Sequence, residues 1–128
     1  VPFGELLKSA DVISVNCALN AQTRDMFTEK EFLSMKQGAY FINTSRGEVV
    51  VEEDLVRVLK TGHLAGAALD VTRKEPIPAD SPLVGCPNLL VPPHIGGSSD
   101  DVQVCGTQMV IASLEAYLDG LTPPHRVA

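Results

Sequence analysis

Three side chains that could together handle an organic acid each follow an apolar stretch of the sequence: Arg46, Glu75 and His94. Arginine offers a planar fork that holds a carboxylate through two hydrogen bonds and keeps its charge at any relevant pH. Histidine titrates near neutrality, so it can give a proton to a carbonyl oxygen or take one from an alcohol. A nearby glutamate favours the protonated imidazole. These residue types suit a site for a keto or hydroxy acid.

Each of these residues also has an ordinary structural interpretation. Arg46 could cap a carbonyl group near its loop, and Glu75, which precedes a proline, could be a solvated loop acid. A single histidine such as His94 is more often a hydrogen-bonded structural residue than a catalyst. Asp70 could cap the loop that follows it or accept hydrogen bonds from a cofactor amide. The catalytic interpretation therefore depends on whether the fold brings these residues together.

The other polar candidates are weaker. His63 follows a glycine in a predicted turn, and His125 lies in a proline-rich tail, where histidines are freely tolerated. Ser45 has no G-x-S-x-G turn around it, so a serine hydrolase is disfavoured.

Four short apolar segments alternate with helical patterns along the chain. A short helix is predicted to end before residue 11, and a Thr28/Glu31 capping box opens a second helix that runs through Met35 and closes at Gly38. A third helix is predicted for residues 52–60, with Gly62 as its left-handed stop. A Ser98/Asp101 capping pattern opens a fourth helix that runs to about Asp119. The predicted strands are 12–17, 39–44, 64–71 and a short one within NLLVPPH, residues 88–94.

This alternation predicts an α/β fold. Strands that are apolar on both faces favour a parallel sheet wrapped by helices, in a doubly wound arrangement. Such sheets gather ligands at the carboxyl ends of their strands, where the sequence supplies ALN, SRG, TRKEP and HIGG. Arg46, Glu75 and His94 all fall in or beside these segments and can therefore converge. Hydride transfer needs the same residues plus a dinucleotide, which sheets of this kind bind.

Composition restricts the possible partners. The chain has 128 residues, of which 45% are hydrophobic, and this length and composition fit one modest domain. Its net charge is −6. It has no basic cluster, so we expect no nucleic-acid partner and no membrane partner. Cys17, Cys86 and Cys105 are widely spaced, without a zinc-ligand pattern, so we expect no metal and a reduced, cytoplasmic setting.

Three motifs together resemble a known family: MKQGAYFINTSRGEVV, LKTGHLAGAALDVTRKEPIPADSPL and PNLLVPPHIGG. In order and spacing they are similar to the D-isomer-specific 2-hydroxyacid dehydrogenases, most closely the glyoxylate/hydroxypyruvate reductase branch. The resemblance implies that Arg46 binds the substrate's carboxylate and carbonyl, that His94 is the acid/base and that Glu75 orients His94. It also implies a small 2-oxo or 2-hydroxy acid substrate, NAD or NADP as cofactor, and a homodimer. The implied cofactor contacts are Cys17, Thr44, Ser45, Arg46, Asp70, His94, Gly96 and Gly97.

The sequence departs from the family pattern in several respects, among them Ala18 where the family usually has proline and Asn20 where it often has threonine. No G-x-G-x-x-G occurs, although this turn cradles the cofactor phosphates in the family. We therefore expect residues 1–120 to form a partial NAD(P)-binding domain, the second half of a Rossmann-like sheet ending in a long helix, with 121–128 as a tail. Such a chain should have little turnover alone. Val51 also stands where the family commonly has an aspartate that caps the next helix, a loss of about 1 kcal/mol.

The last predicted helix is apolar over much of its girth, which predicts that it needs cover on several sides. We expect this apolar surface to promote self-association. Two alternatives to an enzyme stay open: a binding module of the dehydrogenase-like corepressor type, and a non-catalytic fragment that assembles with full-length subunits. The apolar stripe consists of Val102, Cys105, Met109, Ala112 and Ala116, and Val110, Ile111, Leu114 and Leu118 add apolar surface on other faces.

Overall fold

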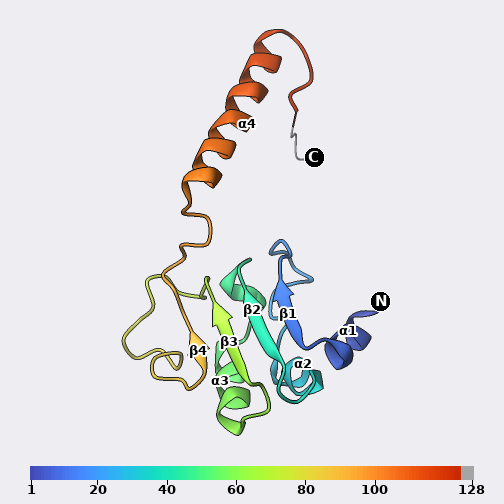
Figure 1. Cartoon of the computed structure of the whole chain (residues 1–128), viewed down its shortest axis with the longest axis vertical. Helices are drawn as coiled ribbons and strands as arrows, with labels where there is room; N and C mark the ends of the chain where they lie inside the picture. Colours follow the sequence, from blue (N-terminus) through green and yellow to red (C-terminus); the bar gives the residue numbers. More distant parts are fainter. Residues whose placement is uncertain (125–128) are drawn as a thin grey trace. The chain divides into compact units, whose positions relative to one another are not determined.

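The computed structural model describes residues 1–124 (Figure 1). Two compact units make up the chain. The first unit comprises Val1–His94, and the second begins at Ile95.

A four-stranded parallel sheet forms the centre of the first unit (Figure 1). Its order, β1-β2-β3-β4, follows the sequence, and the register places Val15, Asn43 and Leu69 side by side at the carboxyl ends. This confirms the predicted parallel α/β sheet with flanking helices. The ladders pair fewer residues than the apolar segments contain, so each strand is shorter than predicted. They are β1 (Val12–Val15), β2 (Tyr40–Asn43), β3 (Gly66–Leu69) and β4 (Leu89–Leu90).

Short helices alternate with the strands, namely α1 (Phe3–Ser9), α2 (Glu29–Ser34), the 3₁₀ helix η1 (Gly47–Val49) and α3 (Glu52–Thr61). The capping box predicted for α2 is present, with Glu31 Oε2 accepting from the Thr28 N–H at 3.2 Å. The predicted end of α2 was wrong, because Met35 is already extended. The stop of α3 at Gly62, with φ of 73°, is confirmed. Val51 precedes α3 without any side-chain cap.

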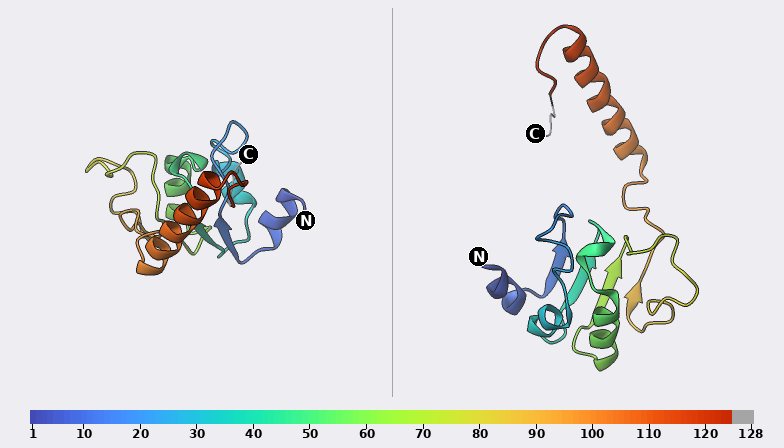
Figure 2. Two further views of the ribbon diagram at one scale, coloured as in Figure 1. Left: turned by 90° about the horizontal axis from the view of Figure 1, so that it is seen from above. Right: turned by 180° about the vertical axis from the view of Figure 1, so that it is seen from behind.

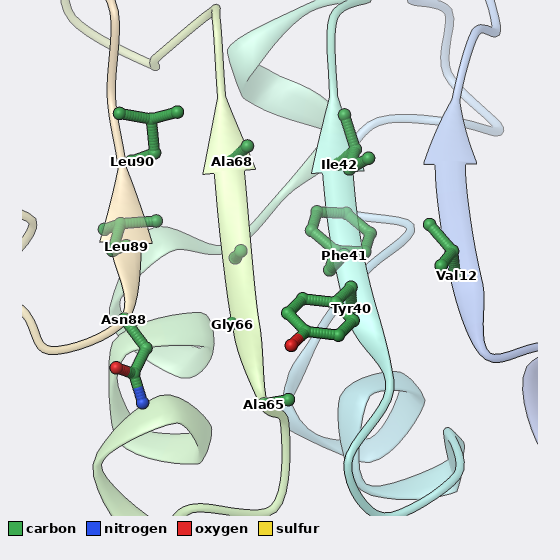
Figure 3. Close-up of a pocket in the computed structure, with 11 residues that line it drawn as sticks. Val12, Tyr40, Phe41, Ile42, Ala65, Gly66, Ala68, Asn88, Leu89 and Leu90 are labelled. Atoms are coloured by element: carbon green, nitrogen blue, oxygen red, sulfur yellow. The ribbon is translucent and has the colours of Figure 1, made fainter.

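The core of the first unit lies on one face of the sheet. The phenylalanine rings of residues 27, 32 and 41 pack against one another beneath the helices, which cover this face as seen from behind in Figure 2. The opposite face carries Val12, Tyr40 and Leu90, which are 53%, 52% and 66% exposed (Figure 3). Alternate strand residues point to opposite faces. Within residues 1–94 the flanking helices therefore cover one face of the sheet and leave the other face open.

The second unit consists of a connecting segment and α4 (Asp100–Leu118). The predicted Ser98 cap was wrong by one position, because the Ser99 side chain accepts from the Val102 N–H at 3.3 Å. After α4, Gly120 has a φ of 72° and Leu121 N–H donates to the Ala116 carbonyl at 2.8 Å, which closes the helix as predicted. No residue of α4 is buried. Among residues 1–124, no helix is long and apolar enough to cross a membrane.

Candidate active site

The loop after β2 presents Arg46 through a turn built around one buried amide. Asn43 is fully buried, and its Oδ1 accepts from the Ser45 N–H at 3.0 Å and from the Ser45 hydroxyl at 2.9 Å. Its Nδ2 donates to the Arg46 carbonyl at 2.9 Å. The Arg46 side chain is exposed, and its Nη1 donates to the Ser45 carbonyl at 2.7 Å. The amide thus fixes the backbone that carries the guanidinium.

The loop after β3 presents Glu75 in a defined orientation. Its Oε1 accepts from the Thr72 N–H at 2.9 Å, and its Oε2 lies 2.8 Å from His94 Nδ1. The hydrogen bond with His94, followed by that from Thr72, holds the pKa of Glu75 below its usual range. Glu75 is therefore an anion at neutral pH, ready to hold an imidazole N–H.

His94 follows β4 and two prolines, which end the strand. Its φ is 54°, in the left-handed region that few non-glycine residues adopt, and its N–H donates to the Pro92 carbonyl at 3.0 Å. This tight turn brings Nδ1 to Glu75 and leaves Nε2 as the second ring nitrogen. The His94 side chain is 49% exposed, so a small solute can reach it.

Three cavities lie at the carboxyl ends of the strands and gather most of the predicted residues. Arg46, Glu75 and His94 share a cavity of about 200 Å³. Asp70 lines a cavity of about 420 Å³ with Glu75, His94 and the apolar residues Ile77, Val91, Pro92 and Pro93. Cys17, Thr44, Ser45 and Arg46 line a third cavity, of about 490 Å³. Gly96 and Gly97 belong to the second unit, in the segment before α4.

Sequence reasoning missed several residues that shape this region. Asn43 could have been found, because a polar side chain at the end of a buried strand needs partners. Arg73 and Glu52 gave no such signal, since their contacts join positions far apart in the sequence. Arg73 N–H donates to Glu52 Oε1 at 2.6 Å.

No group of three histidine, cysteine, aspartate or glutamate side chains within residues 1–124 is arranged to hold a metal ion. Cys17 and Cys86 are partly buried free thiols, and Cys105 is an exposed one. Burial raises the pKa of Cys86.

A parallel sheet with cavities beyond the carboxyl ends of its strands is the arrangement in which Rossmann-like α/β domains bind their ligands. Residues 1–96 match the family described as D-isomer specific 2-hydroxyacid dehydrogenase, NAD binding domain, and the chain belongs to that family. The predicted family is thus confirmed.

Relatives and solved structures agree with this assignment. A glyoxylate/hydroxypyruvate reductase B from Escherichia fergusonii is 37% identical over 118 residues, covering 89% of this chain and 36% of the relative. D-lactate dehydrogenase with NAD+ from Lactobacillus jensenii superposes with a TM-score of 0.88 at 29% identity, covering 100% of this chain and 42% of the other. A D-isomer specific 2-hydroxyacid dehydrogenase from Xanthobacter autotrophicus Py2, in complex with NADPH and MES, has a TM-score of 0.86 at 30% identity. The match covers 98% of this chain and 51% of the other. The chain spans well under half the length of the curated relatives it matches.

Proposed function

We propose that these residues carry the substrate site of an NAD(P)-dependent reductase that converts small 2-oxo acids to 2-hydroxy acids. The observation that carries the proposal is the Glu75–His94 pair, with 2.8 Å between Oε2 and Nδ1, in a cavity shared with Arg46. A charged fork, an acid/base and an orienting carboxylate are the groups that this reduction needs.

Arg46 is the proposed anchor. Its guanidinium can hold a substrate carboxylate through paired hydrogen bonds, and the buried Asn43 amide keeps its backbone in place. The geometry suits recognition more than proton transfer, because an arginine does not lose its proton in this pH range. Arg46 thus selects acids and aligns the neighbouring carbonyl group.

His94 is the proposed acid/base, and Glu75 is its orienting partner. With Nδ1–H held by Glu75, the protonated ring presents an N–H at Nε2 that can donate to the carbonyl oxygen of the substrate. When bound, the reduced cofactor would supply the hydride that the carbonyl carbon needs. The oxygen takes the proton from His94, so the 2-oxo acid becomes a 2-hydroxy acid. The carboxylate of Glu75 stabilises the imidazolium that forms in the reverse direction.

The residues present fit NAD or NADP. Asp70 combines a polar side chain with apolar neighbours in the 420 Å³ cavity, which suits a nicotinamide ring with its carboxamide. Cys17, Thr44 and Ser45 are small and line the neighbouring 490 Å³ cavity, where a cofactor backbone could approach closely. Gly96 and Gly97, which belong to the second unit, are proposed as cofactor contacts on the family resemblance alone.

The proposed substrates are glyoxylate and hydroxypyruvate, in line with the name of the Escherichia fergusonii relative. A cavity of about 200 Å³ accommodates an acid of this size. We further propose a homodimer, because α4 exposes many large apolar side chains. Light scattering on the purified protein measures the oligomeric state, and a monomer would refute the dimer.

The 128-residue chain alone should show little or no turnover, because it contains no G-x-G-x-x-G turn to bind the cofactor phosphates. The assay follows loss of reduced nicotinamide in the presence of glyoxylate. Turnover by the purified chain that exceeds that of its Arg46→Lys variant would refute this statement.

Ligand binding tests the site without requiring turnover. Oxamate, which holds a carboxylate beside a carbonyl group, should shift the backbone amide signals of residues 45–48 in an NMR titration. Arg46→Lys should weaken this binding at least about 10-fold, equivalent to about 1.4 kcal/mol, because an ammonium group cannot copy the fork. Arg57→Lys, on the exposed surface of α3, is the matched control and should leave binding unchanged. Equal oxamate affinity in the parent and Arg46→Lys would remove Arg46 from the site.

A further inference from the structure

The proposed chemistry needs two loops from different strands to keep a fixed separation. Arg46 lies on the loop after β2, whereas Glu75 lies on the loop after β3. A misplacement of about 1 Å between groups that must act together can cost about 100-fold in rate. The residues that hold these two loops together therefore help to determine the geometry of the proposed site.

The two loops touch directly at Gly47. A Cβ atom at this position would overlap the carbonyl group of Thr72 and the backbone nitrogen of Arg73. Only glycine permits this approach of one backbone to another. The contact brings the loops together, but it contributes no directional bond of its own.

The side chain of Arg73 supplies the directional bonds. Its Nε donates to the Val50 carbonyl at 2.6 Å, and Nη2 lies 3.4 Å from the Glu48 carbonyl. The same guanidinium forms an ion pair with Asp25. The side chain of Arg73, on the loop that carries Glu75, therefore binds the backbone around η1, which directly follows Arg46. Only 31% of it is exposed, so these bonds are partly shielded from water.

The backbone of Arg73 is held separately, by Glu52 at the start of α3. The Arg73 N–H donates to Glu52 Oε1 at 2.6 Å, and Glu52 is only 8% exposed. Burial raises the pKa of Glu52, and the N–H and charge of Arg73 act in the opposite direction. Burying a carboxyl group without hydrogen bonds costs free energy, so the hydrogen bond from the Arg73 N–H stabilises Glu52 and at the same time fixes the backbone of Arg73.

We propose that Arg73, seated on Glu52, is a positioning residue that holds the Glu75–His94 pair at a fixed separation from Arg46. The link to Glu75 is short, because Thr72, the residue before Arg73, donates its N–H to Glu75 Oε1 at 2.9 Å. The inference deepens the proposed function and rests on it for its catalytic meaning. The positioning itself can be measured on the chain without turnover.

The experiment is a carboxyl-carbon NMR titration of Glu75 in the full 128-residue chain. In Arg73→Ala the Thr72 N–H should move from the carboxylate, which shifts the pKa of Glu75 upward toward its ordinary value. Arg73→Lys keeps the charge but loses the fork, so it should shift the Glu75 titration in the same direction. Arg57→Ala is the matched control, since Arg57 also pairs with two acids, Glu29 and Asp54, and it should leave the titration unchanged.

Two outcomes would overturn the proposal. One is a Glu75 titration in Arg73→Lys equal to that of the parent, which would show that charge alone matters. The other is an unshifted titration in Arg73→Ala. If Arg73→Ala fails to fold, Arg73→Lys alone decides.

Variants of Glu52 test the hydrogen bond between the Arg73 N–H and Glu52. Glu52→Gln keeps an oxygen that can accept the Arg73 N–H and should leave the Glu75 titration near that of the parent, whereas Glu52→Ala should shift it upward. An unshifted Glu52→Ala titration would overturn the seating of Arg73 on Glu52. Failure of oxamate to bind the parent would refute the proposed function and leave the positioning result standing.

Discussion

The side-chain oxygen of Asn43 accepts hydrogen bonds from both the N–H and the hydroxyl group of Ser45, at 3.0 and 2.9 Å. Because Asn43 is fully buried, no water can replace these bonds. The turn that presents Arg46 therefore depends on one amide.

Replacing Asn43 by alanine should lower the free energy of unfolding by about 1–3 kcal/mol, because it leaves buried polar groups without partners. Urea denaturation of the purified chain measures the change. Asn16→Ala is the matched control, since Asn16 is exposed and its hydrogen bonds to Ser14 and Thr44 are open to water, and it should change stability by less than about 0.5 kcal/mol. Equal effects in the two variants would contradict the role given to Asn43.

Gly47→Ala should destabilise the chain by about 1–3 kcal/mol or prevent folding, because the new methyl group overlaps the backbone of Thr72 and Arg73. Thermal unfolding followed by circular dichroism measures this effect. At Gly4 a Cβ atom would meet open space, so Gly4→Ala should be neutral or slightly stabilising. A stable Gly47→Ala variant with parent-like melting would show that the two loops do not touch.

The lowered pKa of Glu75 predicts one part of the acid dependence of stability. Its pKa in the folded chain lies below the unfolded value of about 4.3, so its contribution is complete above that value and is lost as pH falls through the folded pKa. Glu75→Gln should remove this part of the acid limb in urea unfolding curves measured across pH. The effect should be modest because the side chain is 37% exposed. Identical acid limbs in the parent and Glu75→Gln would contradict the prediction.

His94→Gln should reduce turnover about 100-fold to 10,000-fold, because it removes the general acid, while the Michaelis constant for glyoxylate changes little. The measurement needs a longer protein that joins this chain to a phosphate-binding turn. His63→Gln is the control, because the His63 ring contacts the Met35 carbonyl at 3.0 Å, away from the proposed site. Unchanged turnover in His94→Gln would place the proton donor elsewhere.

Much of the fold follows from local sequence patterns. The Thr28/Glu31 capping box and the left-handed Gly62 are local signals, and both are present in the structure. The cap of α4 was misplaced by one residue, because Ser98 and Ser99 are both good caps and only the helix geometry decides between them. The open sheet face was also missed, since apolar composition shows that cover is favourable and not that cover is present.

The proposed site was predictable in its residue types but not in its supports. Arg46, Glu75 and His94 could be chosen because each follows a strand of a parallel sheet, and the structure places all three around one cavity. The contacts of Arg73 with Asp25 and Glu52 cross long stretches of sequence, so no local pattern could indicate them. Long-range contacts of this kind depend on how the loops pack.

The strand order also sets a length scale. Arg46 follows β2 and His94 follows β4, with β3 between them, and neighbouring strands lie about 4.8 Å apart. The two strand ends are therefore about 10 Å apart, and an arginine and an imidazole fill part of that gap. The spacing of the strands therefore limits the length of the ligand. A molecule bound by both side chains at once can be only a few atoms long, whatever side chains line the rest of the cavity.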